Sequence, residues 1–312
     1  MKVAVLPDKR WPSDHAFLEE VLAKRLPTLG WDVQLFMTYS GEESGPMSPR
    51  TPTQWHGATV SLAGPEPRRT GTISTLLRRY WTRRRAIRHA LETSDAPEVF
   101  WIRNDPFLLP MARALFPDTP ILYQLSFLHF EAYDHSPRPM DRWITGRLGR
   151  RVVLDAARAA DHVAAISPAM AEKLVSDFGI PRERVSSIPL AAVPSFEPAP
   201  ETREWDAVYA GSLQENRELG VLLRSWALVT AKEGKARLLV LGVPSSPGDG
   251  ARFDEEVKAL GLASSVHRRS PVPRSEVAHW IRRAKIGLSV NPPRPYFHVS
   301  SPTQLFEYMA AG

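Results

Sequence analysis

The sequence contains no cysteine, so disulfide bonds, thiolate metal sites and a cysteine nucleophile are excluded. It also has no apolar run long enough to cross a bilayer. The amino terminus lacks the separate charged, apolar and cleavage regions of a signal peptide, because its first residues lead directly into a predicted strand. We therefore expect a cytoplasmic protein.

Several catalytic motifs are missing as well. No G-x-G-x-x-G follows the first predicted strand, which argues against a nicotinamide-dependent dehydrogenase. The sequence has neither a P-loop nor an H-E-x-x-H motif, which mark nucleoside-triphosphate and zinc sites. The residues therefore imply no cofactor and no bound metal.

The chain has 312 residues, of which 43% are hydrophobic and 24% charged, and this is the composition of a globular protein with room for two domains. Its formal net charge is +6. A positive charge attracts polyanions such as sugar nucleotides, anionic lipid head groups or nucleic acid.

Strand and helix patterns alternate along the whole chain, which is typical of α/β domains with parallel sheets. The predicted strands are Lys2–Leu6, Val33–Met37, Ala58–Leu62, Val99–Arg103, Ile121–Leu125, His162–Ile166, Arg184–Leu190, Ala207–Ala210, Arg237–Leu241, Val266–Arg269 and Ile286–Val290. The predicted helices are Asp14–Leu29, Ile73–Leu91, Phe107–Leu115, Asp141–Ala159, Pro168–Phe178, Leu219–Ala231, Arg252–Leu260, Ser275–Ala284 and a final one that ends at Gly312.

A proline-rich stretch interrupts this alternation and divides the chain. We predict an amino-terminal domain over residues 1–193, a linker over 194–204 and a carboxyl-terminal domain over 205–312. Two similar α/β halves joined by a linker place a ligand cleft between them.

The last residues of the chain have the signals of one short capped helix. Ser301 is a favourable N-cap, Pro302 suits the first helical position, and Gln304 completes a capping box of the S-x-x-Q form. Gly312 stands where a left-handed residue would close the helix. The start of such a helix offers free backbone N–H groups and a partial positive charge, which together suit a phosphate.

The sides of this helix are predicted from its spacing. Leu305 and Met309 are four residues apart and are expected to face a core, whereas Thr303 and Glu307 share another side. From there Glu307 could accept hydrogen bonds from hydroxyls beside the phosphate, as in a diphosphate followed by a ribose. The alternative is an ordinary capped helix whose glutamate is solvated.

The run from Ser301 to Gly312 resembles the S-P-T-K-x-x-E-Y-M-A-x-G segment of family-four glycosyltransferases. These are retaining, sugar-nucleotide-dependent enzymes of the GT-B fold, which has two facing Rossmann-like domains. The resemblance implies that Ser301, Pro302, Thr303 and Gln304 hold the donor diphosphate and that Glu307 contacts the donor ribose. The segments Asp161–Ser167 and Val185–Pro198 resemble two further passages of the same family.

A second part of the donor site is predicted after the first strand of the carboxyl-terminal domain. Tyr209–Leu213 with Arg217 resembles the family's first strand and loop, where a glycine turn and a basic residue meet the diphosphate. Gly211 permits close backbone approach, and Arg217 offers a planar fork of donors. Many relatives carry arginine where Ser212 stands, so Arg217 is the one basic contact expected. The alternative for Gly211 is a plain turn after a strand.

The stretch from Asn291 to His298 follows a predicted strand and precedes the phosphate helix, so it is expected to line the cleft. Asn291 and His298 are therefore candidates for sugar or acceptor contacts. Many family members carry a second glutamate eight positions before the ribose-binding one, and Val299 stands there. A carboxylate role on the reacting sugar is therefore not carried over.

Two histidines are candidates in the amino-terminal domain. The segment Ser126–Asp141 is predicted to be a loop at the carboxyl end of a strand, where open α/β sheets bind ligands, and relatives often have a histidine there. His129 is the candidate catalytic residue, and Gln124 and Ser126 occupy nearby positions where such a residue could stand. His15 is a candidate for the acceptor site. The alternative is that both histidines are solvated or locally hydrogen-bonded.

The predicted helix that contains residues Arg78–Arg88 is strongly basic and also carries apolar residues. One interpretation is that it lies against anionic lipid at the inner face of the membrane. The other is a solvated helix face whose apolar stripe packs inward. The arginines concerned are Arg78, Arg79, Arg83, Arg84, Arg85 and Arg88.

Together these patterns predict a retaining, metal-independent glycosyltransferase, since the D-x-D motif of metal-dependent glycosyltransferases is also absent. It would move a sugar from a UDP- or GDP-type donor to a hydroxyl of a glycan or lipid-linked acceptor, in polysaccharide biosynthesis. The alternative is a non-catalytic GT-B relative that binds a nucleotide or another polyanion. Nucleic-acid binding rests only on charge and is not expected, because few aromatic residues accompany the arginines. In the family another strand follows the glycine at Gly312, so we expect a truncated, incomplete second domain.

Overall fold

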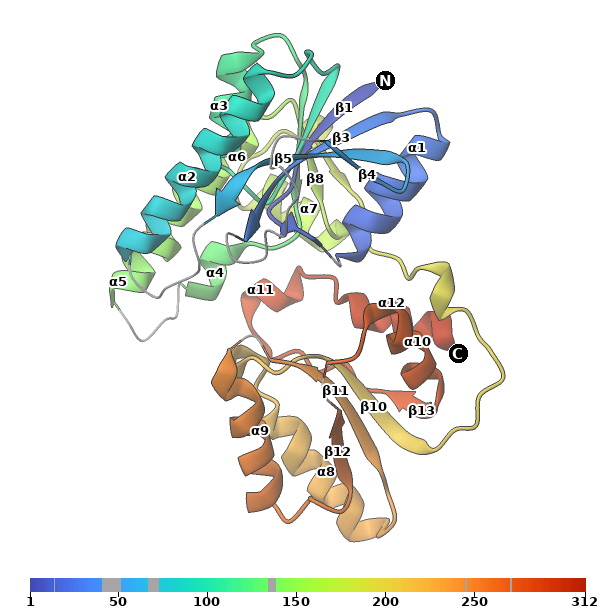
Figure 1. The fold of residues 1–312 in the computed structure, drawn as a ribbon. Helices are drawn as coiled ribbons and strands as arrows, with labels where there is room; N and C mark the ends of the chain where they lie inside the picture. The colour runs from blue at the N-terminus through green and yellow to red at the C-terminus, as the bar shows by residue number, and fades with distance from the viewer. Residues whose placement is uncertain (14, 41–51, 67–72, 134–138, 245, 270) are drawn as a thin grey trace. The chain divides into compact units, whose positions relative to one another are not determined.

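The computed structural model in Figure 1 divides the chain into two compact units. Unit 1 is Met1–Pro189 and unit 2 is Leu190–Gly312. The structure describes all residues except 14, 41–51, 67–72, 134–138, 245 and 270. Each unit is an α/β layer structure, which confirms the predicted fold class.

Unit 1 is built on a mainly parallel sheet with β1 near its centre. The strands are β1 (Lys2–Leu6), β2 (Arg10–Trp11), β3 (Asp32–Ser40), β4 (Thr53–Trp55), β5 (Ala58–Glu66), β6 (Val99–Arg103), β7 (Ile121–Leu125), β8 (His162–Ala165) and β9 (Val185–Ser187). Their order is β4-β5-β3-β1-β6-β7-β8-β9, with β2 beside β3, and only β4 is antiparallel to its neighbour. The chain winds from β1 to β3 and β5 and then returns to β6, so the strand order reverses between β1 and β6. Open α/β sheets bind ligands at such a switch point.

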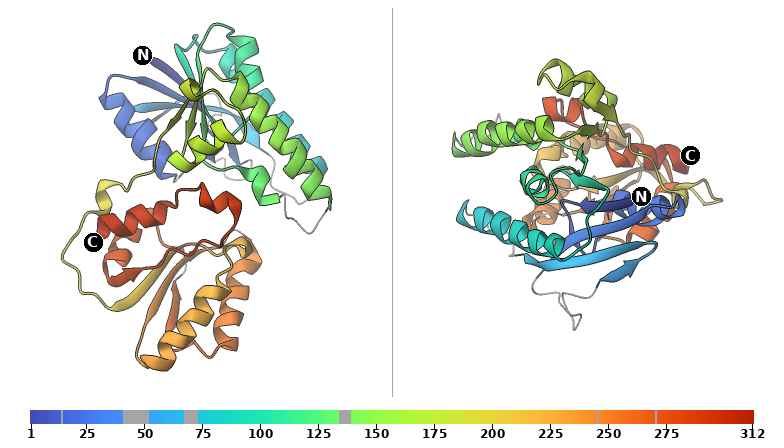
Figure 2. Two further views of the ribbon diagram at one scale, coloured as in Figure 1. Left: turned by 180° about the vertical axis from the view of Figure 1, so that it is seen from behind. Right: turned by 90° about the horizontal axis from the view of Figure 1, so that it is seen from above.

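Helices cover both faces of this sheet. They are η1 (Phe17–Arg25), α1 (Leu26–Thr28), α2 (Ile73–Glu92), α3 (Leu108–Leu115), α4 (His129–Tyr133), α5 (Pro139–Asp141), η2 (Arg142–Leu148), α6 (Gly149–Ala159), α7 (Pro168–Ser176) and η3 (Arg182–Arg184). Helix η1 packs Phe17, Leu18 and Leu22 into a core with Val3 and Val5 of β1. Helices α2 and α6 both pack on α3, and the three form one layer in Figures 1 and 2.

Unit 2 has a smaller parallel sheet of order β12-β11-β10-β13. Its elements are η4 (Pro194–Phe196), β10 (Trp205–Ser212), η5 (Glu215–Arg217), α8 (Gly220–Lys232), β11 (Leu238–Val243), α9 (Pro247–Ala259), β12 (Val266–Arg269), α10 (Arg274–Arg282), β13 (Ala284–Gly287), α11 (Pro295–His298) and α12 (Thr303–Ala311). Alternate residues of β10 point into two cores, Tyr209 into one and Val208 into the other. The sheet is therefore covered on both faces.

Most predicted elements are confirmed, but β2, β4 and α11 were not predicted, and β13 covers Ala284–Gly287 rather than Ile286–Val290. The segment Ser126–Asp141 is not simply a loop, because it contains α4 and α5. Helix α9 begins at Pro247 rather than at Arg252, since Ser246 and Asp249 form a capping box there. Gly312 has a φ of +84°, which confirms the predicted left-handed position at the end of α12.

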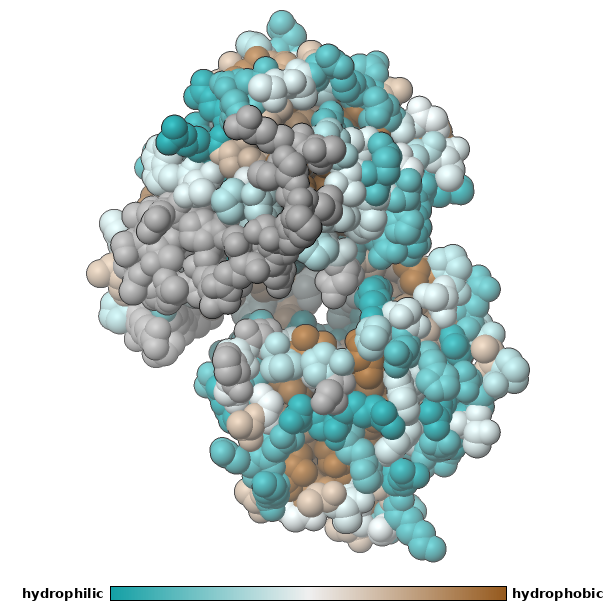
Figure 3. All heavy atoms as spheres, viewed as in Figure 1, coloured by the Kyte–Doolittle hydropathy of each residue, from teal (hydrophilic) through white to brown (hydrophobic). Residues whose placement is uncertain are grey.

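The surface is mixed in character. On the face drawn in Figure 3, apolar residues gather in small patches that hydrophilic residues surround. Among the residues that the structure describes, no helix is long and apolar enough to span a bilayer.

Candidate functional site

The carboxyl edge of the unit 2 sheet brings several predicted donor-site residues together. Gly211 lies near the end of β10, and a Cβ atom placed on it would be 2.8 Å from Gln304 Oε1 and 2.9 Å from the hydroxyl of Tyr209. These distances are shorter than real Cβ contacts, so a side chain at this position would have to displace Gln304 or Tyr209, and glycine lets the end of β10 lie against the start of α12 without that shift. Gly211 and Gln304 are therefore neighbours although 93 residues separate them in the sequence.

Two tyrosines fix this junction. The Tyr209 hydroxyl donates to the Ser212 carbonyl oxygen over 2.8 Å, and burial raises the pKa of Tyr209 to about 12, so it remains a neutral donor. The Ala210 amide donates to the Tyr308 hydroxyl over 2.8 Å, and that hydroxyl lies 3.3 Å from the Leu288 carbonyl oxygen. Helix α12 is thus tied to β10 and to the residue that follows β13.

Arg217 lies at the same edge. Its guanidinium donates to Asn291 Oδ1 over 3.0 Å and stacks over the Phe297 ring at 5.1 Å. The next residue, Glu218, has a φ of +50°, and its carboxylate accepts hydrogen bonds from Arg294. These paired contacts hold the turn after β10 against the segment that leads into α11.

Helix α12 begins differently from the prediction. Its N-cap residue is Pro302, without a side-chain capping bond, so the capping box of Ser301 and Gln304 is wrong. Gln304 instead turns inward, where it is 8% exposed and donates to Ser289 Oγ over 3.3 Å. Ser301 and Pro302 are half-buried in the segment that joins α11 to α12, Thr303 is half-buried at the first position of α12, and His298 is exposed at the end of α11.

The inward face of α12 carries Gln304 and Glu307 beside the apolar Ala311, which reverses the prediction for Leu305 and Met309. These two side chains are 41% and 72% exposed, whereas Glu307 is only 5% exposed. The Glu307 carboxylate accepts a hydrogen bond from Arg274 over 2.8 Å. A buried carboxylate is tolerated when a guanidinium pairs with it, and hydrophobic spacing along the helix could not reveal that partner.

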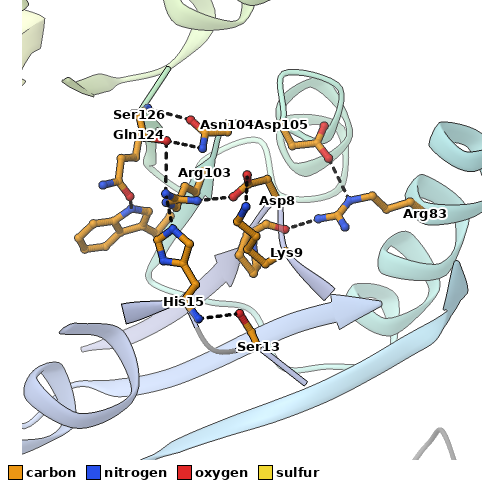
Figure 4. Close-up of polar contacts among 12 residues, drawn as sticks. Asp8, Lys9, Ser13, His15, Arg83, Arg103, Asn104, Asp105, Gln124 and Ser126 are labelled. Atoms are coloured by element: carbon orange, nitrogen blue, oxygen red, sulfur yellow. Dashed lines mark hydrogen bonds and ion pairs between the residues drawn. The ribbon is translucent and has the colours of Figure 1, made fainter. Parts of the chain in front are cut away.

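A second cluster of polar residues lies at the switch point of unit 1 (Figure 4). Arg103 ends β6 and is 4% exposed. Its guanidinium pairs with the Asp8 carboxylate and lies 3.1 Å from His15 Nε2 and 3.3 Å from Ser126 Oγ. One buried cation therefore connects the loop after β1, the residues before η1 and the end of β7.

Asn104 holds Ser126 in the same cluster through its backbone conformation and its side chain. It has a φ of +55°, and its side chain donates to Ser126 Oγ over 2.5 Å while its Oδ1 accepts from the Ser126 amide over 2.8 Å. A left-handed asparagine at a strand end is a feature that often accompanies function. Gln124, by contrast, is buried and accepts a hydrogen bond from the Trp101 indole over 3.0 Å.

A second buried arginine contacts residues next to this cluster. Arg83 of α2 is 4% exposed and donates to Asp105 over 3.0 Å, to Thr38 Oγ1 over 3.3 Å and to the Pro7 carbonyl oxygen. Both interpretations of the basic helix, a solvated face or a lipid contact, are therefore wrong for Arg83. The side chains of Arg78 and Arg79 lie outside the described residues.

The pKa values of the two aspartates in the cluster are shifted in opposite directions. Burial raises the pKa of Asp8, but the Arg103 guanidinium and the Lys9 ammonium outweigh it and hold the pKa below its ordinary value. Asp8 is therefore a carboxylate at neutral pH. Burial raises the pKa of Asp105 despite its pairing with Arg83.

The two candidate histidines have different surroundings. His15 belongs to the switch-point cluster, whereas His129 is exposed at the start of α4 with its ring 4.9 Å from that of Phe127. Sequence analysis missed Asp8, Arg103 and Asn104. All three follow or end strands beside the switch point, so applying the strand-end rule to β1 and β6 would have identified them.

Within the part of the chain that the structure describes, no three His, Asp or Glu side chains are grouped so that they could hold a metal ion. The chain is similar to sucrose-phosphate synthase from Thermosynechococcus elongatus, with a TM-score of 0.70, 16% identity, and coverage of 92% of this chain and 74% of that one. It is also similar to a trehalose-phosphate synthase from Burkholderia xenovorans, solved with glucose-6-phosphate, with a TM-score of 0.69, 13% identity, and coverage of 100% and 82%. These neighbours show that the chain has the GT-B fold.

The particular family follows from the sequence of unit 1. Residues 20–194 match Glycosyltransferase Family 4, and the chain belongs to this family, as the resemblance predicted. A stretch of 156 residues is 29% identical to D-inositol 3-phosphate glycosyltransferase from Thermobispora bispora. That match covers 45% of this chain and spans 36% of the relative's own length.

Proposed function

We propose that this chain transfers a sugar from a nucleotide-diphosphate donor to an acceptor hydroxyl, with retention and without a metal. The donor would bind at the carboxyl edge of unit 2 and the acceptor at the switch point of unit 1. Membership of Glycosyltransferase Family 4 and the GT-B fold support this proposal.

One observation carries the donor assignment. The start of α12, the side-chain-free Gly211 and the guanidinium of Arg217 lie at one edge of the same sheet. A helix start supplies backbone donors, Gly211 lets the end of β10 lie against that helix start, and arginine adds a charged fork. The same groups would stabilise the negative charge that develops on the departing diphosphate.

Glu307 remains our candidate for the donor ribose, with Arg274 as its positioning residue. The ion pair holds the carboxylate in one place, four residues beyond the start of α12. Ribose hydroxyls would then donate to a carboxylate that Arg274 already orients. Asn291 and His298, which flank the same edge, are proposed to contact the transferred sugar.

The acceptor assignment rests on the switch-point cluster. Asp8 offers an ionised carboxylate that can accept a hydrogen bond from an acceptor hydroxyl, and its side chain is 23% exposed. His15 is proposed to act beside it, and His129 is proposed as the catalytic residue from the start of α4. We propose that the acceptor is a glycan or a lipid-linked molecule. The names of the relatives suggest inositol phosphates and sugar phosphates as further acceptors to test.

The rival function is a non-catalytic member of the fold that binds a nucleotide. Its specific support is Val299, a buried apolar residue at the position where many family members have a second glutamate. The distinguishing experiment incubates the full chain with a panel of UDP- and GDP-sugars, with and without acceptors. Release of free nucleoside diphosphate that rises with acceptor supports the transferase, and donor binding without release supports the rival.

A further inference from the structure

Arg217 differs in its partners from two neighbouring arginines at the carboxyl edge of unit 2. Arg294 and Arg274 each pair with a carboxylate, which neutralises their charge. Arg217 instead donates to the amide oxygen of Asn291 and stacks over the ring of Phe297. Among the described residues, the contacts of Arg217 include no ion pair with a carboxylate. Its positive charge is therefore left for an anionic ligand.

Phe297 supports one face of the Arg217 guanidinium. The guanidinium carbon lies 5.1 Å from the centre of the ring, which is within the range of a cation–π contact. Phe297 is half-buried, and its ring centre lies 4.3 Å from that of Tyr296, which is 7% exposed. The N–H bonds of a guanidinium lie in its plane, so a ring against its face leaves them free to donate. One N–H group reaches Asn291, and others remain for a phosphate.

The backbone of Phe297 is fixed to the residues before α12. Its carbonyl oxygen accepts from the Ser300 amide over 3.2 Å and from the Ser300 hydroxyl over 2.9 Å. Ser301 follows directly, and then Pro302, the N-cap residue of α12. Phe297 therefore contacts Arg217 with its ring and the segment that begins α12 with its carbonyl group. One residue connects both parts of the proposed diphosphate site.

The helix that carries Phe297 is also fixed to the turn that contains Arg217. Arg294, the N-cap residue of α11, donates to the Glu218 carboxylate. Glu218 directly follows Arg217 and has a φ of +50°. The turn after β10 and helix α11 thus share an ion pair and a stack. The protein itself therefore sets the orientation of the guanidinium.

We propose that Phe297 is a positioning residue for the donor diphosphate and that it acts through Arg217. This inference rests on the proposed function. An arginine that moves freely loses rotamer freedom when it binds a phosphate, and this loss weakens binding. Phe297 reduces the loss because it holds the guanidinium in one place. Its effect belongs to the two phosphates and not to the base or the ribose.

Calorimetry of the full chain with UDP or GDP and with inorganic pyrophosphate tests this inference, because pyrophosphate has the two phosphates but neither base nor ribose. Phe297→Ala should weaken the binding of nucleotide and pyrophosphate alike by about fivefold, which corresponds to about 1 kcal/mol. Phe297→Leu keeps an apolar side chain without the aromatic face and should show the same loss. Phe297→Tyr keeps the ring and should change neither affinity by more than about twofold.

A double-mutant cycle separates positioning from general packing. In the Arg217→Ala background, Phe297→Ala should have no further effect on affinity, because the group that it positions is gone. Thermal unfolding of each variant reports that unit 2 is folded. The matched control is Arg237→Ala, which removes a stack at 4.3 Å over Trp205 at the opposite edge of the same sheet and should leave both affinities unchanged.

Unchanged pyrophosphate affinity in Phe297→Ala and Phe297→Leu, or the same loss with and without Arg217, would overturn the inference. A pyrophosphate affinity that depends on Phe297, in a chain that releases no nucleoside diphosphate from sugar nucleotides, would retain the inference and remove the proposed function. Release of nucleoside diphosphate together with unchanged affinities in both Phe297 variants would do the reverse.

Discussion

At the scale of single residues, two buried arginines organise the switch point of unit 1. Arg103 and Arg83 each pair with an aspartate and also bond to neighbouring loop atoms. The sequence placed Arg83 on a basic helix, and its burial could not be foreseen, because the partner Asp105 lies 22 residues further along. The signal available in advance was only that both aspartates follow predicted strands.

We predict that Arg83→Met destabilises unit 1 by about 3–5 kcal/mol, because it leaves the Asp105 carboxylate buried without its cation. Denaturant unfolding measures this loss. Arg85→Met changes an exposed arginine on the same helix and should alter the free energy of unfolding by less than about 0.5 kcal/mol. Adding Asp105→Asn to Arg83→Met should recover part of the loss, and equal stability of the Arg83→Met and Arg85→Met variants would contradict the buried-pair account.

The Asp8–Arg103 pair predicts a dependence of stability on pH. The pKa of Asp8 in the folded chain lies below its ordinary value of 3.8, so the pair stabilises above that pH. This stability is lost as the pH falls through the lowered pKa. Asp8→Asn should therefore be less stable than the unchanged chain at neutral pH, and the difference should shrink below about pH 4. A difference that stays constant from pH 7 to pH 3 would speak against an ionised Asp8.

At the scale of elements, α12 shows how far hydrophobic spacing can be trusted. The helix and its end at Gly312 are confirmed, but α11 precedes it and its inward face carries Gln304 and Glu307. Gln304 and Glu307 are buried because Ser289 and Arg274 satisfy them, and Tyr308 supplies the contact to the sheet. Those partners come from other elements, so the sequence of the helix alone cannot reveal its orientation.

The junction of β10 and α12 yields a matched pair of glycine variants. Gly211→Ala should weaken donor binding at least about tenfold and destabilise unit 2 by about 1–3 kcal/mol, because the new methyl group has no room against Gln304 and Tyr209. Gly234→Ala adds a methyl group into open space and should change neither quantity. Calorimetry and thermal unfolding measure both, and normal donor affinity in Gly211→Ala would show that close packing there is not required.

At the scale of the whole molecule, the sequence predicted two α/β units and the family, and both are confirmed. The alternating strands could be recognised in the sequence because parallel strands buried on both faces need continuous runs of apolar residues. The sites were harder to predict, since each is assembled from the ends of several strands. Asn291 and Arg217, for example, are 74 residues apart and meet only because β10 and β13 are adjacent.

The central claim is that the carboxyl edge of unit 2 binds a nucleoside diphosphate, and calorimetry with UDP and GDP tests it most directly. We predict saturable binding by the full chain, with affinity reduced about 10- to 100-fold by Arg217→Ala, the loss expected for a charged hydrogen-bonding pair. Arg224→Ala, a matched change at an exposed arginine of the same unit, should leave that affinity unchanged. Equal affinities of the unchanged chain and Arg217→Ala, or no binding of either nucleotide, would contradict the account.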